Sequence, residues 1–138
     1  MMVSAAEVLA AARSMIDTPF HHQGRQPGVG LDCAGLIVCA FAAVGIEVRD
    51  RAGYSRQPFP GNMSAALSEN AELVRGELQP ADVLWLRFDE PQHLAFLTDR
   101  GTIIHALYTR GAVCEHRFAA AWRHGRLVSA WRHPEVRQ

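Results

Sequence analysis

The spacing of apolar residues changes halfway along the chain, from the period of helices to the two-residue alternation of strands. Near the start, Ser4 and Glu7 form a capping box. This predicts a helix that runs to about Met15 and stops before Pro19. Residues 20–31 hold three glycines, a proline and two histidines. That composition predicts a loop, the kind of segment that often borders a functional site.

The middle of the chain predicts a buried helix, then a polar loop and a short helix. Residues 34–44 are apolar on nearly every side, so this helix must lie in the core, and Gly45 is its expected C-cap. Residues 49–61 are polar and contain two prolines, which indicates a loop. Asn62 is expected to cap the short helix over residues 63–69.

The last third of the chain predicts five strands joined by tight turns. The strands are expected at residues 83–86, 94–98, 102–107, 112–118 and 127–132, with breaks at 89–91, 99–101 and 109–111. Helices followed by hairpin-linked strands predict an α+β fold, in which the N-terminal helices pack on a five-stranded antiparallel sheet.

Composition narrows the classes of function. The 138 residues fit one domain, 1–138, and 49% of them are apolar, which is enough to fill a core. The net charge is zero, from 14 basic and 14 acidic residues, which argues against a nucleic-acid surface. No apolar run approaches the roughly 20 residues that span a bilayer, so no membrane partner is expected.

The start of the chain and its cysteines predict synthesis in the cytoplasm. The first residues lack the charged segment and apolar stretch of a signal peptide. The three cysteines are an odd number without metal-ligand spacing. We therefore expect neither a disulfide scaffold nor a bound metal or other cofactor.

Cys33 lies where the loop meets the buried helix, directly after Asp32. The free N–H groups and the positive dipole end of a helix favour a thiolate, and they can lower a cysteine pKa from about 8.5 to roughly 3.5–7.5. The same N–H groups can donate to an oxyanion. A buried core cysteine is the alternative that position alone leaves open. Cys39 and Cys114 are expected to be core packing, because neither lies at a helix start.

His93 and His105 are the candidate bases for a Cys33 thiolate. If residues 99–101 form a three-residue hairpin loop, Ala95 faces His105, and His93 becomes a diagonal neighbour of His105 on the same face. A two-residue loop would put the histidines on opposite faces. Each histidine taken alone is an ordinary strand residue, and only the combination with a helix-start cysteine favours catalysis.

The expected roles follow from this geometry. His93 would hold Cys33 as a thiolate–imidazolium pair, and His105 would fix the tautomer of His93. A metal site formed by His21 or His22 with His93 is not expected, because adjacent histidines point in different directions and the Cys/His spacing fits no zinc pattern. The other three histidines are expected to be surface or strand residues; they are His116, His124 and His133.

Five ordered motifs resemble the NlpC/P60 family of cell-wall peptidases, over about residues 5–133. The motifs are Thr18-Pro19-Phe20, Asp32-Cys33-Ala34-Gly35-Leu36, Leu78-Gln79-Pro80-Ala81-Asp82-Val83, His93-Leu94-Ala95-Phe96 and Ile104-His105-Ala106. The loop over residues 20–30 and the ending over residues 126–132 are similar to the phage-associated branch of the family.

This resemblance implies a papain-like fold and a cysteine peptidase with the triad Cys33, His93 and His105. The implied substrate is a peptidoglycan stem peptide, cut at the bond between D-γ-glutamate and a diamino acid. The phage branch implies tail proteins as partners and a place in the virion tail. A non-enzymatic tail or assembly component that kept the fold is one alternative, and a thiol amidase or acyltransferase is another.

The chain departs from the family pattern beside the nucleophile. Phe20 replaces a tyrosine and Ala34 replaces a serine, while Ala81 and Ala95 replace glycines. His21 or Gln23 is expected to take over from the missing tyrosine hydroxyl. The candidates for substrate or oxyanion contacts are therefore Phe20, His21, Gln23, Asp32 and Ala34.

Overall fold

The computed structural model describes residues 2–54, 60–87 and 93–138. The helices are α1 (Ala5–Arg13), α2 (Cys33–Ala43), α3 (Pro60–Asn70) and α4 (Ala120–Arg126). The strands are β1 (Val3–Ser4), β2 (Arg25–Gln26), β3 (Gly30–Leu31), β4 (Glu72–Leu73), β5 (Val83–Leu86), β6 (His93–Leu97), β7 (Thr102–Leu107), β8 (Ala112–Arg117), β9 (Leu127–Arg132) and β10 (Val136–Arg137).

Helix α1 begins with the predicted capping box. The Ser4 hydroxyl accepts a hydrogen bond from the Glu7 N–H at 3.1 Å, and the Glu7 carboxylate accepts one from the Ser4 N–H at 3.2 Å. The helix ends at Arg13, two residues before the predicted Met15. Its buried side, including Val8, packs against α2 in the core.

Helix α2 confirms the predicted buried helix, and α3 corrects the segment after it. Gly45 follows α2 with a φ of +84°, a left-handed conformation that glycine adopts without a steric cost. The predicted cap at Asn62 is wrong, because α3 already begins at Pro60. Proline suits the first turn of a helix, since its φ is helical and its missing N–H has no partner there.

The α+β fold is confirmed; within the described residues the large sheet has one strand more than predicted, and there is one additional helix. All five predicted strands are present in one antiparallel sheet of order β4-β9-β5-β6-β7-β8. The sixth strand, β4, pairs with β9, and α4 occupies the connection before β9. The predicted break at 89–91 lies outside the described residues.

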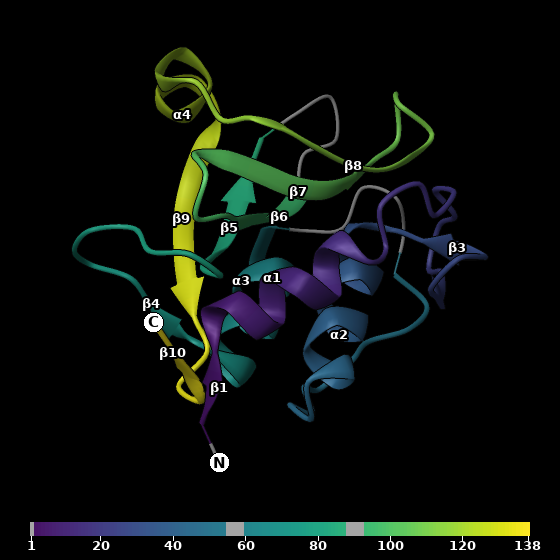
Figure 1. The fold of residues 1–138 in the computed structure, drawn as a ribbon, viewed down its shortest axis with the longest axis horizontal. Coiled ribbons are helices and arrows are strands. Elements are labelled where there is room, and N and C mark those ends of the chain that lie inside the picture. Colours follow the sequence, from purple (N-terminus) through teal and green to yellow (C-terminus); the bar gives the residue numbers. More distant parts are fainter. Residues whose placement is uncertain (1, 55–59, 88–92) are drawn as a thin grey trace.

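Two short pairings escaped the sequence pattern because each strand has only two residues. β2 and β3 form a hairpin inside the predicted loop, and Gln26 there pairs with Gly30. β1 pairs in parallel with β10, which brings the two ends of the chain together at the bottom of Figure 1.

Alternation along the strands divides the apolar residues between two faces of the sheet. Helices α1 and α2 cover one face, where Phe96 and Ile104 join the larger core. Ala95 and Ile103 belong to a smaller cluster on the opposite face. Among the described residues, no helix combines the length and the apolar character that a membrane crossing requires.

Candidate active site

Cys33 is the first residue of α2, as predicted, and its side chain is half-buried. It lines a cavity of about 160 Å³ together with Phe20, Asp32, Ala34 and Leu94. Three of the five predicted substrate or oxyanion candidates therefore border the same space as the sulfur. A thiol at a helix start that opens on a cavity is where a nucleophilic cysteine would be accessible to a substrate.

Helix α2 packs against strand β6. The ring of Phe41 on α2 lies 5.5 Å from the ring of Phe96 on β6. Cys33, the first residue of α2, lines the same cavity as Leu94, the second residue of β6.

The hairpin between β6 and β7 has the predicted register. Phe96 pairs with Ile104, and the Thr98 N–H donates to the Thr102 carbonyl at 3.0 Å. Gly101 has a φ of +70°, so residues 99–101 form the three-residue loop on which the prediction depended.

This register brings the two predicted histidines into contact. The Nε2 of His93 lies 2.7 Å from the Nδ1 of His105, a hydrogen bond between two buried imidazoles. His93 Nδ1 is then the ring nitrogen left for the thiol. The catalytic roles of Cys33, His93 and His105 remain predictions.

A third imidazole continues this contact, and the sequence analysis missed it. The Nε2 of His105 lies 2.7 Å from the Nε2 of His116 on β8. His105 pairs with Cys114 across the ladder, and His116 pairs with Ile103, so His116 is a diagonal neighbour of His105. The register argument that found His93 would also have found His116, had it been applied to the next hairpin.

Burial sets the charge state of the two inner histidines. It lowers the pKa of His93 below the ordinary value near 6.5, and the nearby His116 lowers it further. Burial also lowers the pKa of His105, followed by the effects of His93 and His116. Both rings are therefore neutral at neutral pH. This differs from the thiolate–imidazolium pair that the sequence led us to expect for Cys33 and His93.

Acid should destabilise the protein through these histidines. Above pH 6.5 they are neutral in both states, so they add no pH dependence. Below pH 6.5 the unfolded chain takes up protons that the folded chain excludes, so the free energy of unfolding falls. Each neutral histidine contributes up to about 1.4 kcal/mol per pH unit. Urea unfolding between pH 7.5 and 5 measures this slope.

The matched controls are His105→Asn and His124→Gln. The first should flatten the acid slope by up to about 1.4 kcal/mol per pH unit, because one excluded proton is removed. The second replaces an exposed histidine outside the cluster and is the control for the substitution itself. A wild-type stability that stays constant from pH 6.5 to 5 would contradict the assignment of neutral, buried rings.

The same cluster includes the one group of possible metal ligands found among the described residues. His105, Cys114 and His116 offer ligand atoms within 4.8 Å of one another. Two nitrogens on a tetrahedral zinc ion would stand about 3.3 Å apart, given zinc–nitrogen bonds of about 2.0–2.1 Å. The histidine nitrogens lie closer, at 2.7 Å. The two imidazoles are thus placed as hydrogen-bond partners, and we assign no metal to them.

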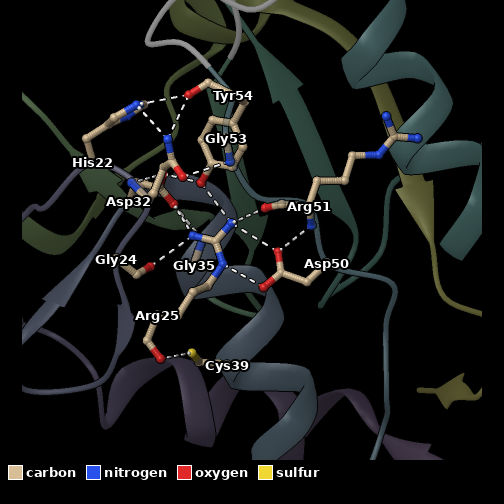
Figure 2. Close-up of polar contacts among 11 residues, drawn as sticks. His22, Gly24, Arg25, Asp32, Gly35, Cys39, Asp50, Arg51, Gly53 and Tyr54 are labelled. Carbon is tan, nitrogen blue, oxygen red and sulfur yellow. Dashed lines mark hydrogen bonds and ion pairs between the residues drawn. The ribbon is translucent and has the colours of Figure 1, made fainter.

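Asp32 organises the start of α2 (Figure 2). It is buried, and its Oδ1 accepts the Gly35 N–H and the Arg25 guanidinium at 2.8 and 2.9 Å. Its Oδ2 accepts the Gln23 N–H at 2.8 Å and the hydroxyl of Tyr54. These partners account for the buried carboxylate, and they tie two loops to the helix end that carries the sulfur.

Arg25 is the centre of the surrounding network. Its guanidinium also contacts Asp50 at 2.8 Å and the Tyr54 hydroxyl at 2.7 Å. Burial lowers the pKa of Arg25, but the carboxylates of Asp50 and Asp32 outweigh it, so the pKa is raised. Burial and the contact with Asp32 raise the pKa of Tyr54. The phenol is therefore a neutral donor at neutral pH.

Tyr54 lines the cavity, which the sequence analysis did not predict. Of the described cavity residues, none is His21 or Gln23, the expected replacements for the hydroxyl lost at Phe20. His21 is exposed. Gln23 instead holds the Tyr54 loop: its amide nitrogen donates to the Tyr54 carbonyl at 3.0 Å, and its amide oxygen accepts the Gly53 N–H at 2.9 Å.

The cavity extends from Cys33 over the apolar side of α2. Its apolar lining includes Ile37, Phe41, Met63, Leu67, Val83 and Leu94. Charged residues from the loop after α2 complete the lining; they are Arg49, Asp50 and Arg51. His133 is buried and also lines the cavity, so the expectation that it is a surface or strand residue is wrong.

Cys39 packs against the core as predicted, whereas Cys114 is half-buried on strand β8. The Cys39 thiol donates to the Arg25 carbonyl at 3.3 Å. Burial raises the pKa of both Cys39 and Cys114 above the ordinary value. Neither thiol therefore forms a thiolate easily at neutral pH.

Known proteins that are similar to this chain belong to one family. The sequence profile of the NlpC/P60 family matches residues 17–132. A "Probable endopeptidase" of Mycobacterium tuberculosis is 27% identical over 99 residues, which make up 72% of this chain and 22% of that protein. The curated relatives from Mycobacterium and Corynebacterium are longer, and the chain spans 22% to 46% of their length.

Solved structures show the same fold. An NlpC/P60 family protein from Bacillus cereus matches with a TM-score of 0.71 at 17% identity, over 96% of this chain and 41% of its own. The NlpC/p60 domain of the peptidoglycan hydrolase SagA matches with a TM-score of 0.66 at 22% identity, over 94% of this chain and 99% of its own.

Proposed function

Because the chain belongs to the NlpC/P60 family, we propose that it is a cysteine endopeptidase that hydrolyses stem peptides of peptidoglycan. The observation that carries this proposal is the buried hydrogen bond between His93 and His105. Cys33, at the head of α2, lines a cavity that a substrate could enter. A thiol, a neutral imidazole and a residue that orients the imidazole are the parts of a nucleophilic acyl-transfer site.

The mechanism follows from these positions. His93 Nδ1 takes the thiol proton of Cys33, and the sulfur attacks the peptide carbonyl carbon. Backbone N–H groups in the first turn of α2 donate to the oxyanion. The His93 imidazolium then protonates the leaving amine, which departs and leaves an acyl-enzyme. Water, deprotonated by His93, attacks this thioester and releases the carboxylate and the thiol.

The proposed bond joins D-γ-glutamate to a diamino acid, as the family resemblance implies. The names of similar proteins support this substrate class, since they include endopeptidases and a peptidoglycan hydrolase. The charged residues of the cavity also suit a wall peptide, because Arg49 and Arg51 can pair with its carboxylates.

Mass spectrometry of products from purified muropeptides tests the proposal. Wild-type protein should leave L-alanyl-D-glutamate on the sugar and release a peptide that begins with the diamino acid. Release of the whole stem peptide from the sugar would instead identify an amidase. Intact muropeptides after prolonged incubation would favour the non-enzymatic alternative.

The phage-tail assignment is part of the same proposal and has narrower support. It comes from the similarity of residues 20–30 and 126–132 to the phage-associated branch. Peptide mass spectrometry of purified virions, made from a lysogen that encodes the chain, should detect it with the tail proteins. Its absence from tails would remove the phage assignment and leave the peptidase proposal standing.

A further inference from the structure

We infer that His116 is a positioning residue of the proposed peptidase site: it fixes the tautomer of His105 and, through His105, leaves His93 with a basic nitrogen for the thiol. This inference rests on the proposed function and goes beyond it, because the family resemblance stops at Cys33, His93 and His105. Three adjacent strands, β6, β7 and β8, carry the three rings.

The geometry is a chain of hydrogen bonds that ends on a backbone carbonyl. His93 Nε2 lies 2.7 Å from His105 Nδ1, and His105 Nε2 lies 2.7 Å from His116 Nε2. His116 Nδ1 lies 3.1 Å from the carbonyl oxygen of Arg117. Successive rings are tilted by 75° and 60°, with centroids 4.8 and 4.7 Å apart.

The carbonyl of Arg117 gives this chain its direction. A carbonyl oxygen can only accept, so His116 Nδ1 must carry the proton. In a neutral imidazole the other nitrogen is then an acceptor, so His116 Nε2 accepts from His105 Nε2. By the same rule His105 Nδ1 accepts from His93 Nε2. The lone pair of His93 is left on Nδ1, the nitrogen that the mechanism requires as base.

The reverse order of protons is unfavourable at both ends. It would place the His116 Nδ1 lone pair against the Arg117 carbonyl oxygen, two acceptors facing each other. It would also place the His93 proton on Nδ1, where a general base needs a lone pair. Because His93 and His105 are buried and neutral, each ring has one proton, and fixing one tautomer fixes the next.

His116 is well placed to act on His105 without touching the reacting atoms. It is half-buried on the edge strand β8. Its Nε2 faces His105, and its Nδ1 faces the carbonyl oxygen of the next residue, Arg117. Without the His116 Nε2 acceptor, the proton of His105 can move from Nε2 to Nδ1. His105 Nδ1 then no longer accepts from His93 Nε2, and nothing favours the tautomer of His93 that acts as a base. Misplaced tautomers in catalytic histidines are costly. Outer hydrogen-bond partners of metal-ligating histidines are typically worth about 10- to 100-fold in activity, and we expect an effect of the same order here.

Long-range ¹⁵N–¹H NMR of the histidine rings tests the inference directly, since it reports which nitrogen carries the proton. The expected pattern in the wild-type protein at pH 7.5 is a proton on Nδ1 of His116, on Nε2 of His105 and on Nε2 of His93. A proton on Nε2 of His116, or on Nδ1 of His93, would overturn the inference.

Kinetics of two variants give a second test. His116→Leu removes the acceptor and should lower kcat by about 10- to 100-fold with little change in KM. His116→Gln keeps an acceptor oxygen and should recover most of kcat. The NMR pattern of His93 should shift in the leucine variant and return in the glutamine variant. A leucine variant with wild-type kcat would contradict the positioning role.

The two proposals fail in different ways. If the wild-type protein cuts no muropeptide, the proposed function fails, and the NMR pattern still decides whether His116 fixes the tautomers. If it cuts muropeptides and the tautomer pattern differs, the peptidase stands and the role of His116 is refuted. His124→Leu, at an exposed position, is the control for nonspecific effects of losing a histidine.

Discussion

Replacing Cys33 by alanine should reduce peptide hydrolysis by about 10⁴- to 10⁶-fold, which is the range seen when a catalytic nucleophile is removed. The acyl-enzyme cannot form without the sulfur, and water is a poor substitute for a thiolate beside His93. The fold should survive, because the side chain is half-buried and alanine suits a helix. Release of product from a defined muropeptide, followed by chromatography, measures the effect.

Cys39→Ala is the matched control on the same helix. Its thiol is bonded to the Arg25 carbonyl and packs against the core, so activity should stay within a few-fold of the wild type. Iodoacetamide labelling separates the cysteines independently: Cys33 should react well below pH 8, while Cys39 and Cys114 stay slow. A Cys33→Ala protein that retains activity would refute the proposed nucleophile.

Asp32→Ala should destabilise the protein by about 3–5 kcal/mol, the cost of breaking a buried ion pair by removing one partner. The carboxylate caps α2 at the Gly35 N–H and pairs with Arg25 at 2.9 Å. Its removal leaves a guanidinium and the Tyr54 hydroxyl without their buried acceptor. Urea unfolding at pH 7.5 measures the loss as a lower midpoint with an unchanged slope.

Asp50→Asn is the matched control for this ion-pair network. Asp50 contacts the same guanidinium, but its side chain is 38% exposed, so its pair with Arg25 is worth about 1 kcal/mol or less. A loss below about 1 kcal/mol in Asp32→Ala would show that the network does not hold the helix start. Because Cys33 follows Asp32 directly, loss of the helix cap in Asp32→Ala should also slow the labelling of Cys33 by iodoacetamide.

The network beside Cys33 fixes a second loop at the start of α2. Gly35, in the first turn, has no room for a side chain, because an added Cβ would clash with the Gly24 carbonyl oxygen. The loop that carries Arg25 therefore packs directly on the helix start. Tyr54, whose hydroxyl contacts Asp32 and Arg25, lines the cavity that Phe20 also lines.

The sequence by itself determined the elements and the pairing of the two catalytic candidates. The capping box, the apolar helix and the alternating strands are local patterns, so each can be predicted from a short segment of sequence. The register of the β6–β7 hairpin is also local, because a three-residue loop ending in Gly101 fixes which residues face each other. From that loop alone His93 and His105 could be placed together.

Only the tertiary structure decided which other residues line the cavity that Cys33 borders. Tyr54 meets Asp32 across 22 residues, and His133 reaches the cavity from the far end of the chain. These contacts come from irregular loops, whose path depends on the packing of the whole molecule and leaves no period in the sequence. The direction of proton donation along the three histidines could not be predicted for a related reason. It depends on one backbone carbonyl, that of Arg117, and on the burial that keeps the rings neutral.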